Sequence, residues 1–264
     1  MDNVTVIIPV HEIKNETKQL LSNCLKSVSL QEKTINNVLI VKSNNFTEES
    51  ELLLNDVNKE YKYKTISNTS GNTYQEQINF AVDNIDTEYF TILEFDDELS
   101  SKWSLANEKH LSYDEFKDTD ILLNLVAQTD VNGNLANLTN EIFWAYGYSE
   151  ERGKLDLEGV KNYPVISLNG ALIKTESFKK IGKLKTKIVV NNEYEFLLRA
   201  VNEGLDINVL PRIVYKHLNG RKESIQMGLT KKYNGKELKA LHKVPLDEYH
   251  FTEDREIELN LLDE

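Results

Sequence analysis

Cysteine is almost absent from this chain, and that absence excludes two kinds of site. Cys24 is the only cysteine among 264 residues, so the chain has no intrachain disulfide and no cysteine-based metal site. It lies on an apolar stripe with Leu21, Leu25 and Val28, which favours a small core residue over a nucleophile. The scarcity of cysteine gives the cytoplasm as the expected location.

Long apolar runs are also missing. No stretch approaches the roughly 20 apolar residues that a helix needs to cross a bilayer. The first residues, Met1-Asp2-Asn3, lead directly into a strand-like run and lack the basic region and cleavage site of a signal peptide. We therefore expect no stable membrane insertion.

The chain also has no excess of basic over acidic residues. The formal net charge is −12, from 43 acidic and 31 basic residues, which disfavours tight, non-specific binding to nucleic acid or to an anionic membrane. Local basic patches are still possible at Lys183, Lys185 and Lys187, or at Arg221 and Lys222. A solvated basic face is the more common meaning of such runs.

The first hundred residues alternate between strand-like and helix-like patterns. The β-branched run Val4–Val10 is typical of a strand buried on both faces. Thr47 is a candidate N-cap for an acidic helix. The expected order is strand 4–10, helix 16–30, strand 38–41, helix 48–59, strand 63–66, helix 74–82 and strand 89–95. Such alternation predicts a Rossmann-like, mostly parallel sheet flanked by helices.

The later part of the chain is less regular. Asn132-Gly133 is a strong hairpin turn, and we expect it to join Ile121–Gln128 to a run near Ile142–Trp144. Further expected elements are strand 165–174, helix 176–181, helix 193–202 and two strands, 207–210 and 213–215, separated by Pro211. Beyond about residue 221 the apolar periodicity weakens, so the end of the chain is expected to be helical or partly disordered.

Carboxylates gather where the strand 89–95 ends. Its apolar residues run directly into Glu94, Asp96, Asp97 and Glu98. Carboxylate oxygens are the ligands of hard cations such as Mg²⁺ and Mn²⁺. In open α/β sheets, ligands also bind at the carboxyl ends of the strands. The pattern predicts a metal-assisted enzyme whose substrate is anionic, most simply a diphosphate.

Five segments in order are similar to the family 2 glycosyltransferases of the GT-A fold, across roughly residues 4–217. They are VTVIIPVHE at 4–12, LSNCLKSVSLQ at 21–31, NTSGNTYQEQINFAVDNIDTEYFTILEFDDEL at 68–99, NGALIKTESFKKIGKL at 169–184 and NNEYEFLLRAVNEG at 191–204. The resemblance implies an α/β GT-A domain at 1–220, with a nucleotide-sugar half at 1–100, an acceptor half at 101–220 and an extension at 221–264.

The resemblance also implies an activity, which is transfer of a sugar from a nucleoside-diphosphate sugar to an acceptor hydroxyl with inversion. A divalent cation, Mn²⁺ or Mg²⁺, would neutralise the leaving diphosphate. Asp96 is the first expected ligand, with Glu94 in place of the usual Asp and His217 as a third. Glu193 occupies the position of the catalytic base. Its nearest rival, Glu195, should project from a different face of the helix.

The implied nucleotide pocket is formed by several short segments. Lys42 departs from the family pattern, because it stands where an Asp usually accepts hydrogen bonds from base and ribose. A uridine nucleotide is the default, but guanosine, cytidine and thymidine nucleotides stay open. The expected pocket residues are Pro9, His11, which would stack on the base, Glu12, Ser43, Gly71, Gln77, Glu94, Phe95 and Asp96.

On the acceptor side we expect Asp97, Trp144, Asn169 and Gly170. A glycan, a protein or a modified nucleic-acid base could be the acceptor, and a lipid-linked sugar fits less well. Two other functions stay open. Departures at Lys42, Glu94 and Asn192 are compatible with an inactive nucleotide- or glycan-binding module. A nucleotidyltransferase is less favoured, because no Gly-rich basic loop follows the first strand.

Overall fold

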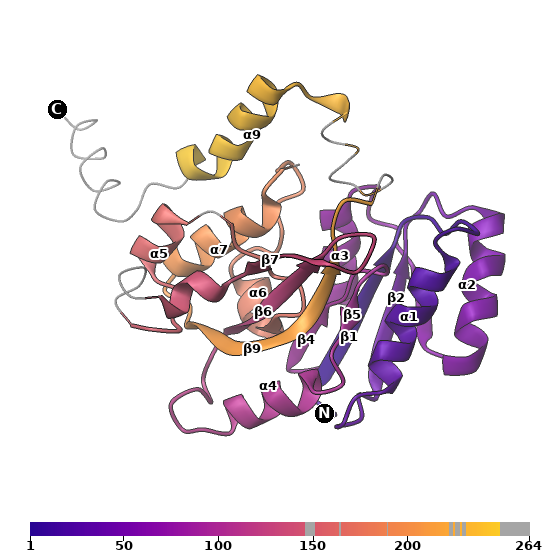
Figure 1. The fold of residues 1–264 in the computed structure, drawn as a ribbon, viewed down its shortest axis with the longest axis horizontal. Helices are drawn as coiled ribbons and strands as arrows, with labels where there is room; N and C mark the ends of the chain where they lie inside the picture. The colour runs from indigo at the N-terminus through magenta and orange to yellow at the C-terminus, as the bar shows by residue number, and fades with distance from the viewer. Residues whose placement is uncertain are drawn as a thin grey trace.

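The protein is described by a computed structural model that covers residues 1–145, 151–163, 165–188, 190–221, 224, 228 and 231–248. Within these residues the strands form one nine-stranded sheet in the order β3-β2-β1-β4-β8-β6-β9-β5, with β7 paired to β6 (Figure 1). The strands are β1 (Val4–Val10), β2 (Asn37–Lys42), β3 (Lys64–Ser67), β4 (Tyr89–Ile92), β5 (Glu98–Leu99), β6 (Ile121–Thr129), β7 (Leu135–Thr139), β8 (Leu172–Lys174) and β9 (Ile207–Leu218).

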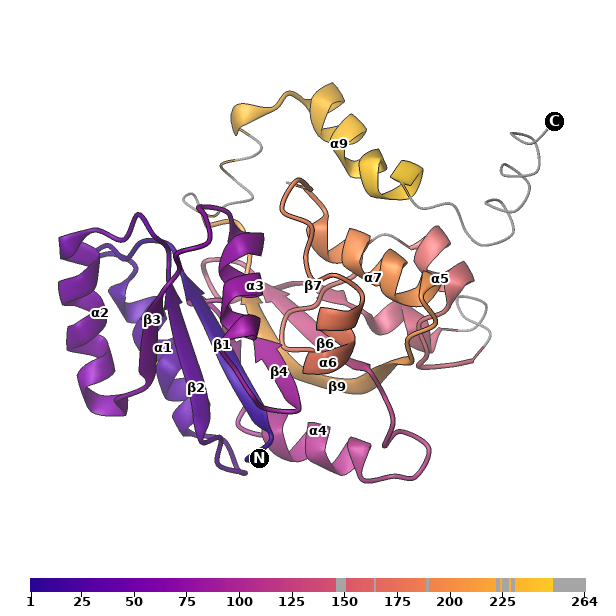
Figure 2. The same ribbon diagram turned by 180° about the vertical axis from the view of Figure 1, so that it is seen from behind.

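The first half of the sheet is parallel. Strand β1 pairs with β2 on one side and with β4 on the other, and β2 pairs with β3. Helices α1 (Lys18–Ser29) and α2 (Glu48–Tyr61) cover one face, and α3 (Tyr74–Asp83) covers the other (Figures 1 and 2). Both faces of β1 are therefore buried, which explains why its sequence is apolar apart from Thr5.

Side chains at the helix starts account for two of the boundaries. The hydroxyl of Thr47 accepts the N–H of Ser50 and caps α2, as predicted. Thr73 and Glu76 form a reciprocal capping box at the start of α3. Because this box fixes where α3 begins, it also fixes Tyr74 in the first turn.

In the second half, antiparallel pairs join the parallel ones. Strand β8 pairs antiparallel with β4 and β6, whereas β6 and β9 form a long parallel ladder. The helices of this half are α4 (Trp103–Leu111), the 3-10 helix Glu141–Trp144, α5 (Leu157–Asn162), α6 (Thr175–Lys180) and α7 (Asn192–Asn202). In Figure 2, α6 and α7 lie on the same face as α3.

Three expectations for this half were wrong in detail. The strand after Asn132-Gly133 is Leu135–Thr139, and Ile142–Trp144 belongs to the 3-10 helix. Within 165–174 only Leu172–Lys174 is a strand. The two late strands are one strand, β9, because its ladder with β6 absorbs Pro211 through a shift in register.

The predicted fold class, an α/β fold with a mostly parallel central sheet flanked by helices, is confirmed, and the longest ladders are the parallel pairs of β1 with β2 and of β6 with β9. Helix α9 (Gly235–Glu248) follows β9 and lies near the carboxyl ends of the strands (Figure 1). The end of the predicted extension, 249–264, lies outside the described residues, and the domain boundaries stay a prediction. No described helix is long and apolar enough to span a bilayer.

Candidate active site

A cleft of about 760 Å³ opens at the carboxyl ends of the central strands. It brings together side chains that are far apart in the sequence. Of the predicted site residues, those that line it are His11, Glu12, Glu94, Phe95, Asp96, Asn169, Glu193 and His217. The acids after β4, the start of α7 and the end of β9 therefore face one shared space.

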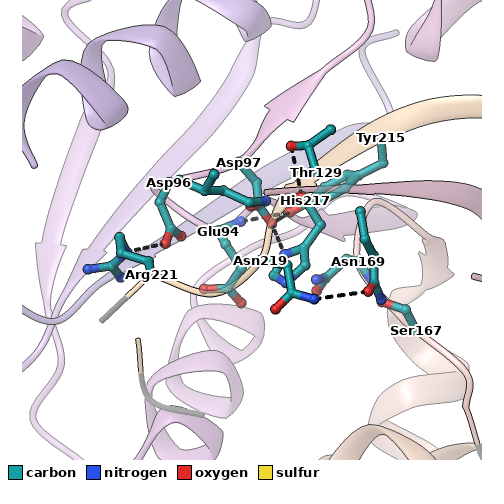
Figure 3. Close-up of polar contacts among 12 residues, drawn as sticks. Glu94, Asp96, Asp97, Thr129, Ser167, Asn169, Tyr215, His217, Asn219 and Arg221 are labelled. Carbon is teal, nitrogen blue, oxygen red and sulfur yellow. Dashed lines mark hydrogen bonds and ion pairs between the residues drawn. The ribbon is translucent and has the colours of Figure 1, made fainter. Parts of the chain in front are cut away.

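Asp97 anchors this arrangement. Its side chain is buried and accepts three hydrogen bonds from β9, from the Tyr215 hydroxyl at 2.7 Å, the His217 Nδ1 at 2.9 Å and the Leu218 N–H at 2.8 Å (Figure 3). These bonds occupy both carboxylate oxygens. The sugar contact predicted for Asp97 is therefore not what its geometry provides, because the side chain turns away from the cleft and fixes the turn to β9.

Burial alone would lower the pKa of His217, but the hydrogen bond to Asp97 and the nearby carboxylates outweigh it and raise that pKa to about 9. The imidazole is therefore mainly protonated at neutral pH. It contributes a positive charge to the cleft opposite Glu193.

The two other acids of the turn each have one partner. Asp96 Oδ2 lies 2.7 Å from Nε of Arg221, and Figure 3 shows the two side chains pointing at each other. Glu94 Oε1 lies 2.6 Å from the hydroxyl of Tyr74. Burial raises the pKa of Glu94 to about 8, and the neighbouring Asp96 and Asp97 oppose the effect of the Tyr74 hydrogen bond. Glu94 is therefore largely protonated at neutral pH.

Glu193 lies in the first turn of α7. The backbone N–H of Leu168 donates to its Oε2 at 3.0 Å. Burial raises the pKa of Glu193, while this hydrogen bond and the charge of His217 act in the opposite direction. Glu195, the alternative base, is fully buried and forms a two-pronged ion pair with Arg199, at 2.9 and 3.0 Å. Of the two, only Glu193 lines the cleft.

The acids of the cleft do not form a metal centre in this arrangement. No group of three His, Cys, Asp or Glu side chains in the described part of the chain is placed to hold a metal ion. Asp96 faces Arg221, Glu94 faces Tyr74, and Asp97 is occupied by β9. Carboxylates and an imidazole suit Mn²⁺ or Mg²⁺ chemically, but the set predicted from Asp96, Glu94 and His217 does not converge here, so the residues as arranged do not fit the ion.

Four predicted nucleotide-pocket residues are not among the residues that line the cleft. Gln77 is buried and its amide donates to the carbonyls of β1 and β2, at Val10 and Val41. The hydroxyl of Ser43 donates to the carbonyl of His11 at 2.8 Å. Pro9 is buried within β1, and the Gly71 carbonyl accepts from Asn68. These residues shape the loops that hold the lining residues, and none of the four lines the cleft itself.

Two predicted acceptor residues lie outside the lining as well. Gly170 has a φ of +71°, and a Cβ there would lie 2.3 Å from the Tyr215 ring, so its lack of a side chain lets β9 approach. The Trp144 indole donates to the carbonyl of Val209 at 3.0 Å. Asn169, between them in sequence, does line the cleft.

Lys42, the departure noted in the sequence, forms an ion pair with Glu51 at 2.8 Å. Lys42 is not among the lining residues.

Two atoms of lining residues lack a partner within the described part of the chain, Nε2 of His11 and Nδ2 of Asn192. Both atoms are buried, and a buried polar group without a partner is costly.

Sequence reasoning missed several lining residues, including Asn72, Thr73, Tyr74, Gln75, Ser167, Asn219 and Arg221. The spacing of Thr73 and Glu76 is a capping-box signal that could have placed Tyr74 at the start of a helix near the acids. Arg221 carried no such signal, because its partner Asp96 is 125 residues away.

An α/β sheet whose strand-end acids face a helix-borne glutamate across one cleft is the architecture of GT-A glycosyltransferases, and solved structures of that class share the fold. The N-terminal 349 residues of S. aureus TarS with UDP-GlcNAc match with a TM-score of 0.62 and 16% identity, over 86% of this chain and 61% of that one. The mannosyltransferase PcManGT from Pyrobaculum calidifontis, with GDP-Man and Mn²⁺, matches with a TM-score of 0.59 and 15% identity, over 84% and 58%.

The model of glycosyl transferase family 2 matches residues 5–182. The chain therefore belongs to that family, as the sequence resemblance implied. No curated protein sequence matches it. It spans about three fifths of these two solved chains, and 37% of the longer crystallised TarS chain.

Replacing Asp97 with Ala should destabilise the fold strongly. The change leaves the buried Tyr215 hydroxyl and the part-buried donors of His217 and Leu218 without their acceptor, and breaking a buried pair costs about 3–5 kcal/mol. Urea unfolding would measure the loss. Glu98→Ala is the matched control, because Glu98 forms a more exposed ion pair with Lys216 and should cost less than about 1 kcal/mol. Equal losses in the two variants would contradict the anchoring role of Asp97.

Glu94→Gln should change how stability depends on pH. Because the pKa of Glu94 rises to about 8 in the folded state, the native protein binds a proton that the unfolded chain has released. Wild-type stability should therefore fall as pH rises from about 4.5 to 8, and the Gln variant should lack this component. Urea unfolding in EDTA at several pH values would show the variant gaining relative to wild type across that window. Parallel curves would refute the assignment.

Proposed function

We propose that this protein is a glycosyltransferase, which moves a sugar from a nucleoside-diphosphate sugar to an acceptor hydroxyl with inversion at the anomeric carbon. The observation that carries the proposal is the placement of Glu193 in the same cleft as His11 and the acids after β4. The complexes of the structural neighbours with UDP-GlcNAc and GDP-Man support a nucleotide sugar as donor.

Glu193 is the proposed general base. The acceptor oxygen forms a bond to the anomeric carbon while the bond from that carbon to the diphosphate breaks. The leaving nucleoside diphosphate takes the electron pair, and the acceptor proton goes to Glu193. Backbone support from Leu168 holds the carboxylate in place, and a pKa raised by burial makes it a better proton acceptor.

The nucleotide is proposed to lie along the first-half wall of the cleft. His11 and Tyr74 lie there with ring centroids 6.2 Å apart, and His11 presents an unpartnered Nε2. Uridine is the default base and guanosine the main alternative. A glycan, a protein or a modified base could be the acceptor, and Asn169 is the proposed contact on the acceptor side of the cleft.

Assistance by Mn²⁺ or Mg²⁺ stays a prediction. The PcManGT complex contains Mn²⁺, but the described acids of this chain are directed to protein partners. No step above depends on a metal ion.

Glu193→Gln should lower turnover by about 10²- to 10⁴-fold, which is the usual contribution of a general base. Affinity for UDP or GDP should stay nearly unchanged, because the amide keeps the shape of the carboxylate. Donor hydrolysis and transfer assays with UDP-GlcNAc and GDP-Man, with nucleotide affinity from calorimetry, would measure both quantities. NMR of the product would show whether the anomeric configuration inverts.

Glu203→Gln is the control, because Glu203 is an exposed acid at the other end of the same helix. If Glu193→Gln retained its kcat, the assignment of the base would be wrong. Binding of nucleotides without any turnover in the wild type would instead favour the inactive binding module.

A further inference from the structure

The cation that faces Asp96 in this protein is a guanidinium group. Nε of Arg221 lies 2.7 Å from Oδ2 of Asp96, and the two side chains are only 17% and 12% exposed. Arg221 directly follows the two residues that leave β9, and Asp96 lies in the turn after β4. A shielded pair of this kind lasts only when its geometry is good, because each charge has lost most of its water.

The guanidinium has a second contact, with the ring of Phe95. The Arg221 Cζ lies 5.2 Å from the centroid of the Phe95 ring, a distance at which a cation is attracted to an aromatic face. Asp96 engages Nε only. In the described part of the chain, no protein acceptor is recorded for Nη1 or Nη2, so the four N–H groups on these atoms are available to a ligand.

The pair also limits what a metal ion could find here. Both oxygens of Asp97 are used by β9, and Asp96 Oδ2 is already neutralised by Arg221. The turn therefore does not offer a cation the pair of free carboxylates expected from its sequence. A diphosphate approaching these acids still needs a positive group between itself and them, and Arg221 lines the cleft at that place.

We propose that Arg221, held by Asp96 and Phe95, binds the diphosphate of the donor in place of a divalent cation. The inference rests on the proposed use of a nucleoside-diphosphate donor. An arginine presents parallel N–H donors that match two phosphate oxygens at once. Its positive charge would stabilise the negative charge that gathers on the leaving diphosphate as the glycosidic bond breaks.

Calorimetric titration with UDP and GDP, in EDTA and separately in Mn²⁺, tests this assignment. The wild type should bind at least one of the two in EDTA, with a Kd within about threefold of the value in Mn²⁺. Arg221→Ala should weaken that binding by about 10- to 100-fold, the range for lost charge-assisted hydrogen bonds. The corresponding monophosphate should lose much less, because the contact is to the diphosphate.

Three further variants sharpen the test. Arg221→Lys keeps the charge without the planar fork and should be intermediate between wild type and Arg221→Ala, which also covers the case in which the Ala variant does not fold. Arg212→Ala removes an exposed arginine within β9 and should change nothing. Asp96→Asn should keep binding in EDTA within a few-fold, because the amide oxygen still accepts from Nε.

The inference is overturned if nucleotide binding requires Mn²⁺ and is indifferent to Arg221→Ala, or if Asp96→Asn abolishes Mn²⁺-dependent binding. Either result would leave the transferase proposal standing. A wild type that binds neither nucleotide, with or without Mn²⁺, would instead refute the use of a nucleoside-diphosphate donor, and this inference would fail with it.

Discussion

The three hydrogen bonds to the buried carboxylate of Asp97 are the contact on which the cleft depends. A buried carboxylate is tolerated only when donors surround it, so Tyr215, His217 and Leu218 must stay beside the turn after β4. The same contact carries the end of β9, and with it Arg221, to the tip of the first-half sheet. The pairing of β5 with β9 acts in the same direction, because β5 directly follows the acids of the turn.

The order of the strands in the sheet also places residues from both halves of the chain at the cleft. Strands β1 and β2 deliver His11 and its neighbours at their carboxyl ends, while β8 lies between β4 and β6 and reverses direction. The chain before β8, residues 165–171, is therefore free to run as an irregular segment along the cleft, where it supplies Ser167 and Asn169. The absence of a regular strand over most of 165–174 is what allows the backbone N–H of Leu168 to reach Glu193.

Sequence patterns predicted the structure correctly where it depends on residues that are close together in the chain. The β-branched run Val4–Val10 is typical of a strand buried on two faces, and Thr47 was a recognisable helix cap. The placement of Glu94, Asp96, Glu193 and His217 in one cleft also followed from the family resemblance. The partners of the acids did not follow, because Arg221 meets Asp96 only through the fold, and no spacing rule connects residues 125 positions apart. Gly170 was read as a binding residue when its role is to admit the Tyr215 ring.

The charge arrangement also distinguishes Glu193, the proposed base, from the three acids of the turn after β4. Asp97 is committed to β9, and Asp96 to Arg221. Burial raises the pKa of Glu94 to about 8, so at neutral pH its carboxyl group mostly retains its proton and shares a hydrogen bond with Tyr74. Burial also raises the pKa of Glu193, but a backbone N–H and the protonated His217 favour its charged form. A carboxylate that is held in place and open to the cleft is what removal of a proton from an acceptor hydroxyl requires.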